Sequence, residues 1–117
     1  MRGSRWVFWV TTSATLAITA TVTAATGNKA HDILVAMPAD QQAKALGQVV
    51  GEGCAGKSAF FMGMQPENKA SWSVLCTNGK SYNISISPDA GGSTKILECS
   101  VLKAVAHVDC FKKFSAQ

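Results

Sequence analysis

The sequence predicts an α+β domain: a small antiparallel sheet of three to four strands in a meander, with an N-terminal and a C-terminal helix packed on one face. Helix-like apolar spacing occurs before and after the middle of the chain, strand-like alternation fills the middle, and four cysteines are spread through it. With 117 residues, the chain is long enough for one domain. We divide it into a signal peptide (1–25), a flexible leader (26–37) and one disulfide-stapled domain (38–114).

The N-terminal segment has the pattern of a secretory signal peptide. Arg2 and Arg5 provide a basic start, an uncharged stretch covers 6–25, and small residues precede two candidate cleavage points, after Ala24 and after Ala25. The stretch is about long enough to span a bilayer, but its many threonines dilute the apolar content that a membrane helix needs. We expect cleavage, no stable membrane insertion afterwards, and export to a bacterial periplasm or secretion; an uncleaved anchor is the alternative.

An amphipathic helix is predicted over 38–50, because apolar residues recur there at steps of three and four. Pro38 is compatible with a first helical turn, and Gly51 and Gly53 end the helix just before Cys54. Its apolar face consists of Ala39, Ala43, Leu46 and Val50.

Four strands are expected next, over 60–64, 71–76, 81–87 and 95–99. Asn78-Gly79 is predicted as a two-residue turn that joins the second and third of them as a hairpin. Apolar and polar residues alternate along the third strand, so one face of the sheet is expected to be dry and the other wet. In this hairpin, Trp72 and Tyr82 are expected to lie in the core.

A short second helix follows the last strand. Ser100 is a candidate N-cap, and apolar residues recur at helical spacing as far as Val108, leading to Cys110. Lys112 and Lys113 come next, between two phenylalanines. Two lysines are too few for a strong anionic contact, so we expect a solvated end whose phenylalanines, Phe111 and Phe114, pack on the sheet.

The four cysteines predict two disulfide bonds. An even count in a short exported chain is typical of a disulfide framework, and no two cysteines have the close spacing of a zinc ribbon or a redox dithiol. Three pairings are open. We favour Cys54–Cys76 and Cys99–Cys110, because the latter two flank the second helix while Cys54 closes the first helix near the strand that carries Cys76.

Charge argues against a nucleic-acid partner. The formal net charge is +4, but both arginines, Arg2 and Arg5, lie in the predicted signal peptide. The remaining chain therefore lacks the residue type that most often reads phosphates and bases.

The hairpin stretch from Gly79 to Ile86, after a helix in an exported chain, resembles PepSY-like domains. This resemblance covers one hairpin and implies a non-catalytic extracytoplasmic module. It assigns no functional residue.

Two further patterns suggest chemistry that their context does not favour. Gly51 to Ser58 matches the phosphate-binding loop GxxxxGK[ST], but a helix precedes it and a strand follows, the reverse of what that loop needs. Asn83-Ile84-Ser85 fits a glycosylation acceptor, but Asn83 lies within a predicted strand.

Soft metal ligands offer another possibility. Met62 and Met64 are two residues apart on a strand, so their thioethers are expected on the same side, where they suit Cu(I). His31, Met37 or His107 could complete such a site. The alternative is that the two methionines fill gaps in the core.

His107 beside Asp109 or Asp32 invites a proton-transfer role, but no nucleophile motif accompanies it. We therefore expect a small exported non-catalytic binding or accessory module without a cofactor, whose partner is a protein or a small ligand. A periplasmic copper handler using Met62 and Met64 is the alternative, and an enzyme of unknown class ranks third. The oligomeric state is left open.

Overall fold

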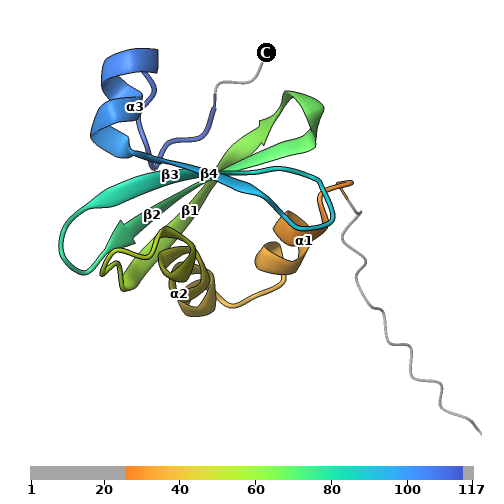
Figure 1. The fold of residues 1–117 in the computed structure, drawn as a ribbon, viewed down its shortest axis with the longest axis horizontal. Helices are drawn as coiled ribbons and strands as arrows, with labels where there is room; N and C mark the ends of the chain where they lie inside the picture. The colour runs from red at the N-terminus through yellow and green to blue at the C-terminus, as the bar shows by residue number, and fades with distance from the viewer. Residues whose placement is uncertain (1–25, 115–117) are drawn as a thin grey trace, which may run out of the picture.

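The computed structural model describes residues 26–114 (Figure 1). The predicted signal peptide and its anchor alternative lie outside the described residues. Within the described part, none of the helices has the length and apolar character needed to cross a membrane. The elements in chain order are α1 (Lys29–Val35), α2 (Ala39–Val50), β1 (Gly56–Gln65), the 3₁₀ turn η1 (Pro66–Asn68), β2 (Lys69–Cys76), β3 (Ser81–Ile86), β4 (Thr94–Glu98) and α3 (Cys99–Ala106).

The sheet is an antiparallel meander in the order β1-β2-β3-β4, as predicted. Strand β1 begins at Gly56, four residues before the predicted start. At the β2–β3 turn, Gly79 has a φ of +90°, and Lys80 donates its backbone N–H to the Asn78 side chain at 2.9 Å. The turn differs from the predicted two-residue turn, because only its glycine has a positive φ and Asn78 does not. The Gly79 N–H donates to the Cys76 carbonyl at 3.0 Å and the Cys76 N–H to the Lys80 carbonyl at 2.8 Å, so the loop has three residues, 77–79, with the glycine last.

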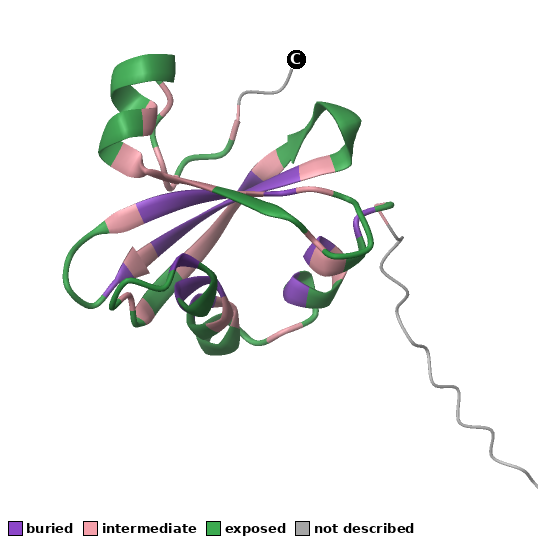
Figure 2. Ribbon diagram, viewed as in Figure 1, coloured by how far each residue is buried: buried purple, intermediate pink, exposed green. Residues whose placement is uncertain are grey.

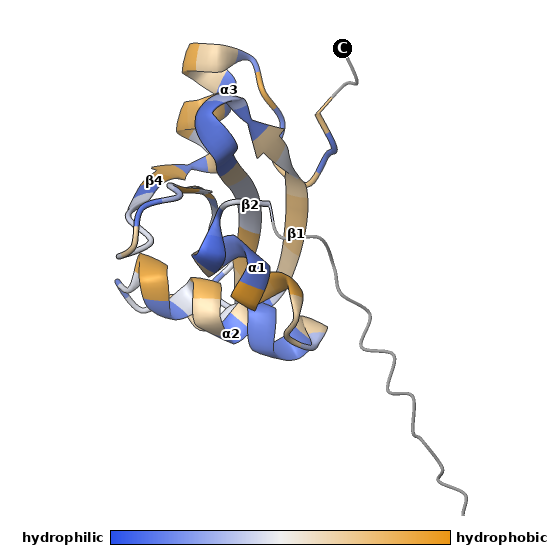
Figure 3. Cartoon of the chain, turned by 90° about the vertical axis from the view of Figure 1, so that its right-hand side faces the viewer, coloured by the Kyte–Doolittle hydropathy of each residue, from blue (hydrophilic) through white to orange (hydrophobic). Residues whose placement is uncertain are grey.

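The expectation that the N-terminal and C-terminal helices share one face of the sheet is not confirmed. Helices α1 and α2 lie against one face, while α3 lies on the other side (Figures 1 and 3). No residue separates β4 from α3, so the helix starts where the strand ends. Leu102 of α3 lies close to the face that carries Asn83 and Leu97. The opposite face is already covered by side chains of α1 and α2, which leaves this one for α3.

The segment predicted as a leader contains helix α1. Asn28 caps this helix by accepting the His31 N–H at 3.1 Å, and the Asn28 side chain is fully buried. Its amide nitrogen also donates to the carbonyls of Asn68 and Ile86 at 2.8 and 2.9 Å. One side chain therefore satisfies polar groups from three parts of the chain and ties the start of the helix to the sheet.

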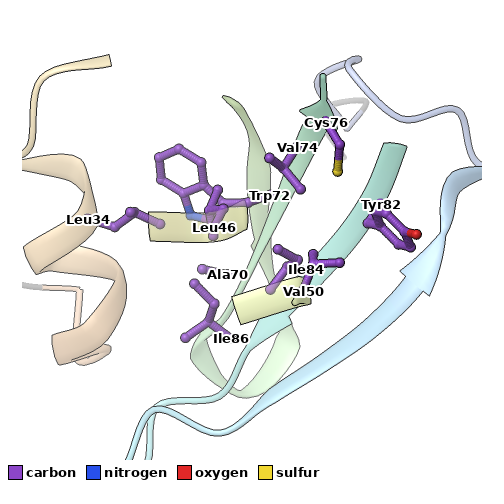
Figure 4. Packing of buried hydrophobic residues seen from close by; sticks show 10 residues of the cluster. All are labelled: Leu34, Leu46, Val50, Ala70, Trp72, Val74, Cys76, Tyr82, Ile84 and Ile86. Atoms are coloured by element: carbon purple, nitrogen blue, oxygen red, sulfur yellow. The ribbon is translucent and has the colours of Figure 1, made fainter. Parts of the chain in front are cut away.

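The main core lies between the sheet and helices α1 and α2 (Figures 2 and 4). Trp72 is 2% exposed and Tyr82 8%, which confirms that both are core residues. They are diagonal neighbours, because Trp72 pairs with Ile84 and Tyr82 with Val74. The buried cluster consists of Leu34, Leu46, Val50, Ala70, Trp72, Val74, Cys76, Tyr82, Ile84 and Ile86.

Both favoured disulfide bonds are present. Cys54–Cys76 joins the segment after α2 to the end of β2, and Cys99–Cys110 bridges the start of α3 and the chain just after it. All four cysteines are used. The second bond therefore keeps a short peripheral helix attached at both of its ends.

Candidate functional site

The face of the sheet away from α1 and α2 is polar in its centre, and we call it the polar face. Ser71, Ser73 and Asn83 lie there, yet they are only 1%, 0% and 8% exposed. This face was expected to be wet. It is instead covered by α3 and by the chain that follows Cys110 (Figure 1). Its buried polar groups therefore need partners within the protein.

Met62 lies at the centre of this polar cluster and is 1% exposed. Its thioether sulfur lies 2.9 Å from Ser73 Oγ, 3.4 Å from Asn83 Nδ2 and 3.9 Å from Ser71 Oγ, all of which donate toward it. A thioether is only a weak acceptor, so three donors around one sulfur is an unusual way to satisfy them. Asn83 Nδ2 has a stronger acceptor in Ser71 Oγ, at 2.8 Å.

Met62 and Met64 do not point to the same side, contrary to the prediction. The β1–β2 register shifts between Phe61 and Gly63, which leaves Met62 as the extra residue of a β-bulge. After the bulge, Met64 pairs with Ala70, which belongs to the core on the opposite face. Because paired residues of antiparallel strands share a face, the bulge separates the two thioethers.

The other candidate metal ligands are also scattered. His31 and Met37 pack on the α1 and α2 side, and His107 is exposed at the end of α3. Residues 26–114 contain no cluster of three or more His, Cys, Asp and Glu side chains suited to a metal ion. The geometry brings no predicted ligand set together.

The C-terminal segment packs on the sheet, which confirms the prediction for Phe111 and Phe114. The Phe111 N–H donates to Ser73 Oγ, and the Phe114 N–H donates to the Met62 carbonyl, both at 3.0 Å. A side-chain carbon on Gly63 would lie 2.9 Å from the Phe114 ring, so this glycine permits the close approach. Lys113 lies 4.8 Å from the centre of the Phe61 ring, a cation–π contact.

The remaining opening of the polar face is a groove of about 400 Å³, which we call the α3 groove. Asn83 and Ser85 line it from β3, Lys95 and Leu97 from β4, and Leu102 from α3. The turn before β2 provides its other end, through Gln65, Pro66, Glu67 and Lys69.

Two groups in the α3 groove lack partners among the described residues. Asn83 uses its amide nitrogen for Met62, Ser71 and the Trp72 carbonyl, but no described donor reaches its Oδ1. Lys95 is exposed and forms no ion pair there, whereas Lys69 lies 3.8 Å from Glu67. A buried carbonyl without a donor and an unpaired ammonium are groups that a ligand can satisfy.

A second, smaller hollow of about 180 Å³ lies between α1, α2 and the β3–β4 turn. It is lined mainly by apolar side chains, among them Leu34 and Leu46. At its rim, Ile33 is 53% exposed and Val49 41% exposed. It offers mainly hydrophobic contact, and Thr94 is the polar side chain among its lining residues.

The phosphate-loop pattern does not form such a loop. Gly51 ends α2, while Lys57 and Ser58 lie in β1, which pairs antiparallel with β2. No helix follows the glycines, so the required strand–loop–helix arrangement is missing from this part of the structure. Asn83 is likewise a poor glycosylation acceptor, because its amide nitrogen is buried in hydrogen bonds.

His107 and Asp109 do not form a proton-transfer pair in the described structure. Asp109 accepts a 2.7 Å hydrogen bond from Lys103, and this bond, together with the lysine charge, lowers the Asp109 pKa. His107 instead closes α3, with a left-handed φ of 58°. Both residues therefore lie at the end of α3, where Asp109 pairs with Lys103.

His31, suggested by the sequence as a metal ligand, is instead a buried partner of Trp72. It is 3% exposed, and its Nδ1 accepts a 3.0 Å hydrogen bond from Trp72 Nε1. Its ring also lies 4.6 Å from that of Phe61. Burial lowers the His31 pKa, although neighbouring Asp32 acts in the opposite direction.

Comparison with known proteins gives no further lead: no family model, no curated protein and no solved structure matches the chain.

Proposed function

We propose that this chain is an exported, non-catalytic binding module, in a bacterial periplasm or secreted, whose ligand occupies the α3 groove. The ligand class that suits the groove is a small organic anion with an apolar portion. The observation that carries the proposal is the buried Asn83 side chain, whose Oδ1 has no donor among the described residues. A ligand hydroxyl or N–H would satisfy this oxygen.

The other walls of the groove support the same class of ligand. Lys95 supplies a positive charge and forms no ion pair with a described carboxylate. Leu97 and Leu102 supply apolar contact beside it. The groove volume of about 400 Å³ falls within the range typical of small-molecule sites. The Cys99–Cys110 bond holds the α3 wall in place, which lowers the entropy cost of binding.

Three small probes test this proposal by NMR titration of the isotope-labelled protein. 2-Hydroxyisovalerate carries the charge, the apolar group and a hydroxyl that can donate to Asn83 Oδ1, whereas isovalerate lacks the hydroxyl and 2-hydroxyisovaleramide lacks the charge. We expect 2-hydroxyisovalerate to bind most tightly, with a dissociation constant on the order of millimolar for so small a molecule. The expected shifts are at the Asn83 side-chain amide and at the backbone amides of Leu97 and Leu102.

Two matched variants make the test specific. Lys95→Gln should weaken 2-hydroxyisovalerate binding by roughly three- to tenfold, because it removes a charge–charge contact. Lys44→Gln, on the exposed side of α2, should leave it unchanged. Equal binding by all three probes, or equal loss in both variants, would contradict a charged site in the α3 groove.

A further inference from the structure

A small polar network precedes α1. The backbone nitrogen of Thr26 lies 3.4 and 3.2 Å from the two carboxylate oxygens of Asp32, and Thr26 Oγ1 donates to this carboxylate at 2.9 Å. The Asn28 N–H in turn donates to Thr26 Oγ1 at 3.1 Å, which links the network to the helix cap. The nitrogen of residue 26 is therefore held directly against a carboxylate.

Thr26 is also the first residue that one of the two candidate cleavage points would leave. Hydrolysis of the Ala25–Thr26 peptide bond consumes one water, puts a carboxylate on Ala25 and turns the Thr26 amide into an amine. That amine is protonated below its pKa of about 8. Cleavage after Ala24 would instead keep the Thr26 nitrogen within a peptide bond. Cleavage after Ala25 would therefore place an ammonium beside Asp32, whereas cleavage after Ala24 would leave a peptide amide there.

We infer that the mature chain begins at Thr26 and that its new α-ammonium forms an ion pair with Asp32. This inference rests on the proposed export and deepens it by choosing between the cleavage points. An ammonium brings three donors and a full positive charge, where the amide brings one N–H, so processing strengthens an existing contact.

The ion pair also affects the core, because Asp32 belongs to α1. This helix contributes the buried side chains of His31 and Leu34, so fixing its first turn also fixes their positions on the sheet. The precursor lacks the ion pair, and the mature form is the more stable of the two. Removal of the signal peptide therefore completes the fold as well as releasing the chain.

Two measurements on the protein recovered from its native host test this inference. Intact mass spectrometry identifies the first residue, for which we expect Thr26. NMR after reductive methylation with labelled carbon then follows the titration of the α-amine. We expect its pKa to lie above about 8 in the wild type and to fall in Asp32→Asn. Asp40→Asn, which changes an exposed acid in the first turn of α2, should leave it unchanged.

A stability cycle measures the same contact independently. Acetylating the α-amine should raise the unfolding constant by roughly two- to fivefold in the wild type, the range of a partly exposed ion pair, and leave Asp32→Asn unaffected. A chain that begins at Ala25 overturns the inference while export stands, whereas an uncleaved chain overturns both. A chain beginning at Thr26 whose amine titrates identically in the wild type and in Asp32→Asn overturns the ion pair.

Discussion

The two faces of the sheet are buried in different ways. On the α2 face, apolar side chains from β2 and β3 meet an amphipathic helix that contributes four buried residues. On the polar face, the buried side chains are serine, asparagine and methionine, and α3 contributes no buried residue at all (Figure 2). Hydrophobic burial holds the first face together, while hydrogen bonds and a disulfide bond hold the cover of the second.

This difference assigns different roles to the two faces. A close-packed apolar face leaves little freedom for side chains to adjust, so it specifies the fold. The polar face keeps a groove, an unpaired carbonyl and a cover made from one short helix and the chain end. For this reason the ligand site that we propose lies on the second face, away from the main core.

The largest expected effect comes from truncating one leucine on each face. Leu46→Ala removes a side chain that is 2% exposed in the main core and should destabilise the protein by about 2–5 kcal/mol. Leu102→Ala, on the partly exposed inner side of α3, should cost less than about 1 kcal/mol. Urea unfolding of both variants gives the comparison, and equal losses would show that the faces do not differ in this way.

The α2 face could be predicted because its signals are local and periodic. Helical spacing identified Ala43, Leu46 and Val50, and period-two alternation with an Asn-Gly turn identified β2, β3 and their pairing. The cysteine pairing followed from the same elements, because each bond joins segments that the chain order brings close.

The polar face could not be predicted to the same extent. A single extra residue in β1, Met62, separated two methionines that the alternation placed on one side. The prediction that α3 shares a face with α2 was not confirmed either, because the apolar spacing of a helix does not determine which side of the sheet it covers. The alternating Asn83 and Ser85 on β3 marked a polar face, but only tertiary structure buried Asn83 and opened the α3 groove beside it.

The disulfide bond beside the groove provides a second test of the comparison. Replacing Cys99 and Cys110 together by serine should cost about 2–3 kcal/mol, because the bond closes a short loop. The loss should be confined to the polar face. Hydrogen exchange should speed up in α3 and at the amides of Phe111 and Phe114, while the amides of β2 stay protected.

The control for this prediction is the other bond. Replacing Cys54 and Cys76 removes a link whose second cysteine is buried in the main core, so it should lower protection throughout the sheet. If both double variants lose protection across the whole domain, the polar face and the α2 face unfold as one unit.

The smallest expected effect is a loss of stability at acid pH, caused by protonation of His31 on the α2 face. Trp72 Nε1–H can donate to His31 Nδ1 only while that nitrogen carries no proton, so protonation of His31 breaks a buried hydrogen bond. Because burial lowers the His31 pKa in the folded state, the unfolded chain binds the proton more readily. Stability from this source is complete above the unfolded pKa of about 6.5 and decreases as the pH falls below it.

Urea unfolding between pH 5 and 8 measures this dependence, followed by Trp72 fluorescence in the chain without residues 1–25, which contain the other two tryptophans. His31→Gln removes the titrating group and should flatten the decrease that begins near 6.5, while His107→Gln, at the exposed end of α3, should leave it as in the wild type. An unchanged pH dependence in His31→Gln would mean that another group causes it. Since His31 is the histidine that contacts Trp72, a flattened curve would identify the docking of α1 as the acid-sensitive contact of the core.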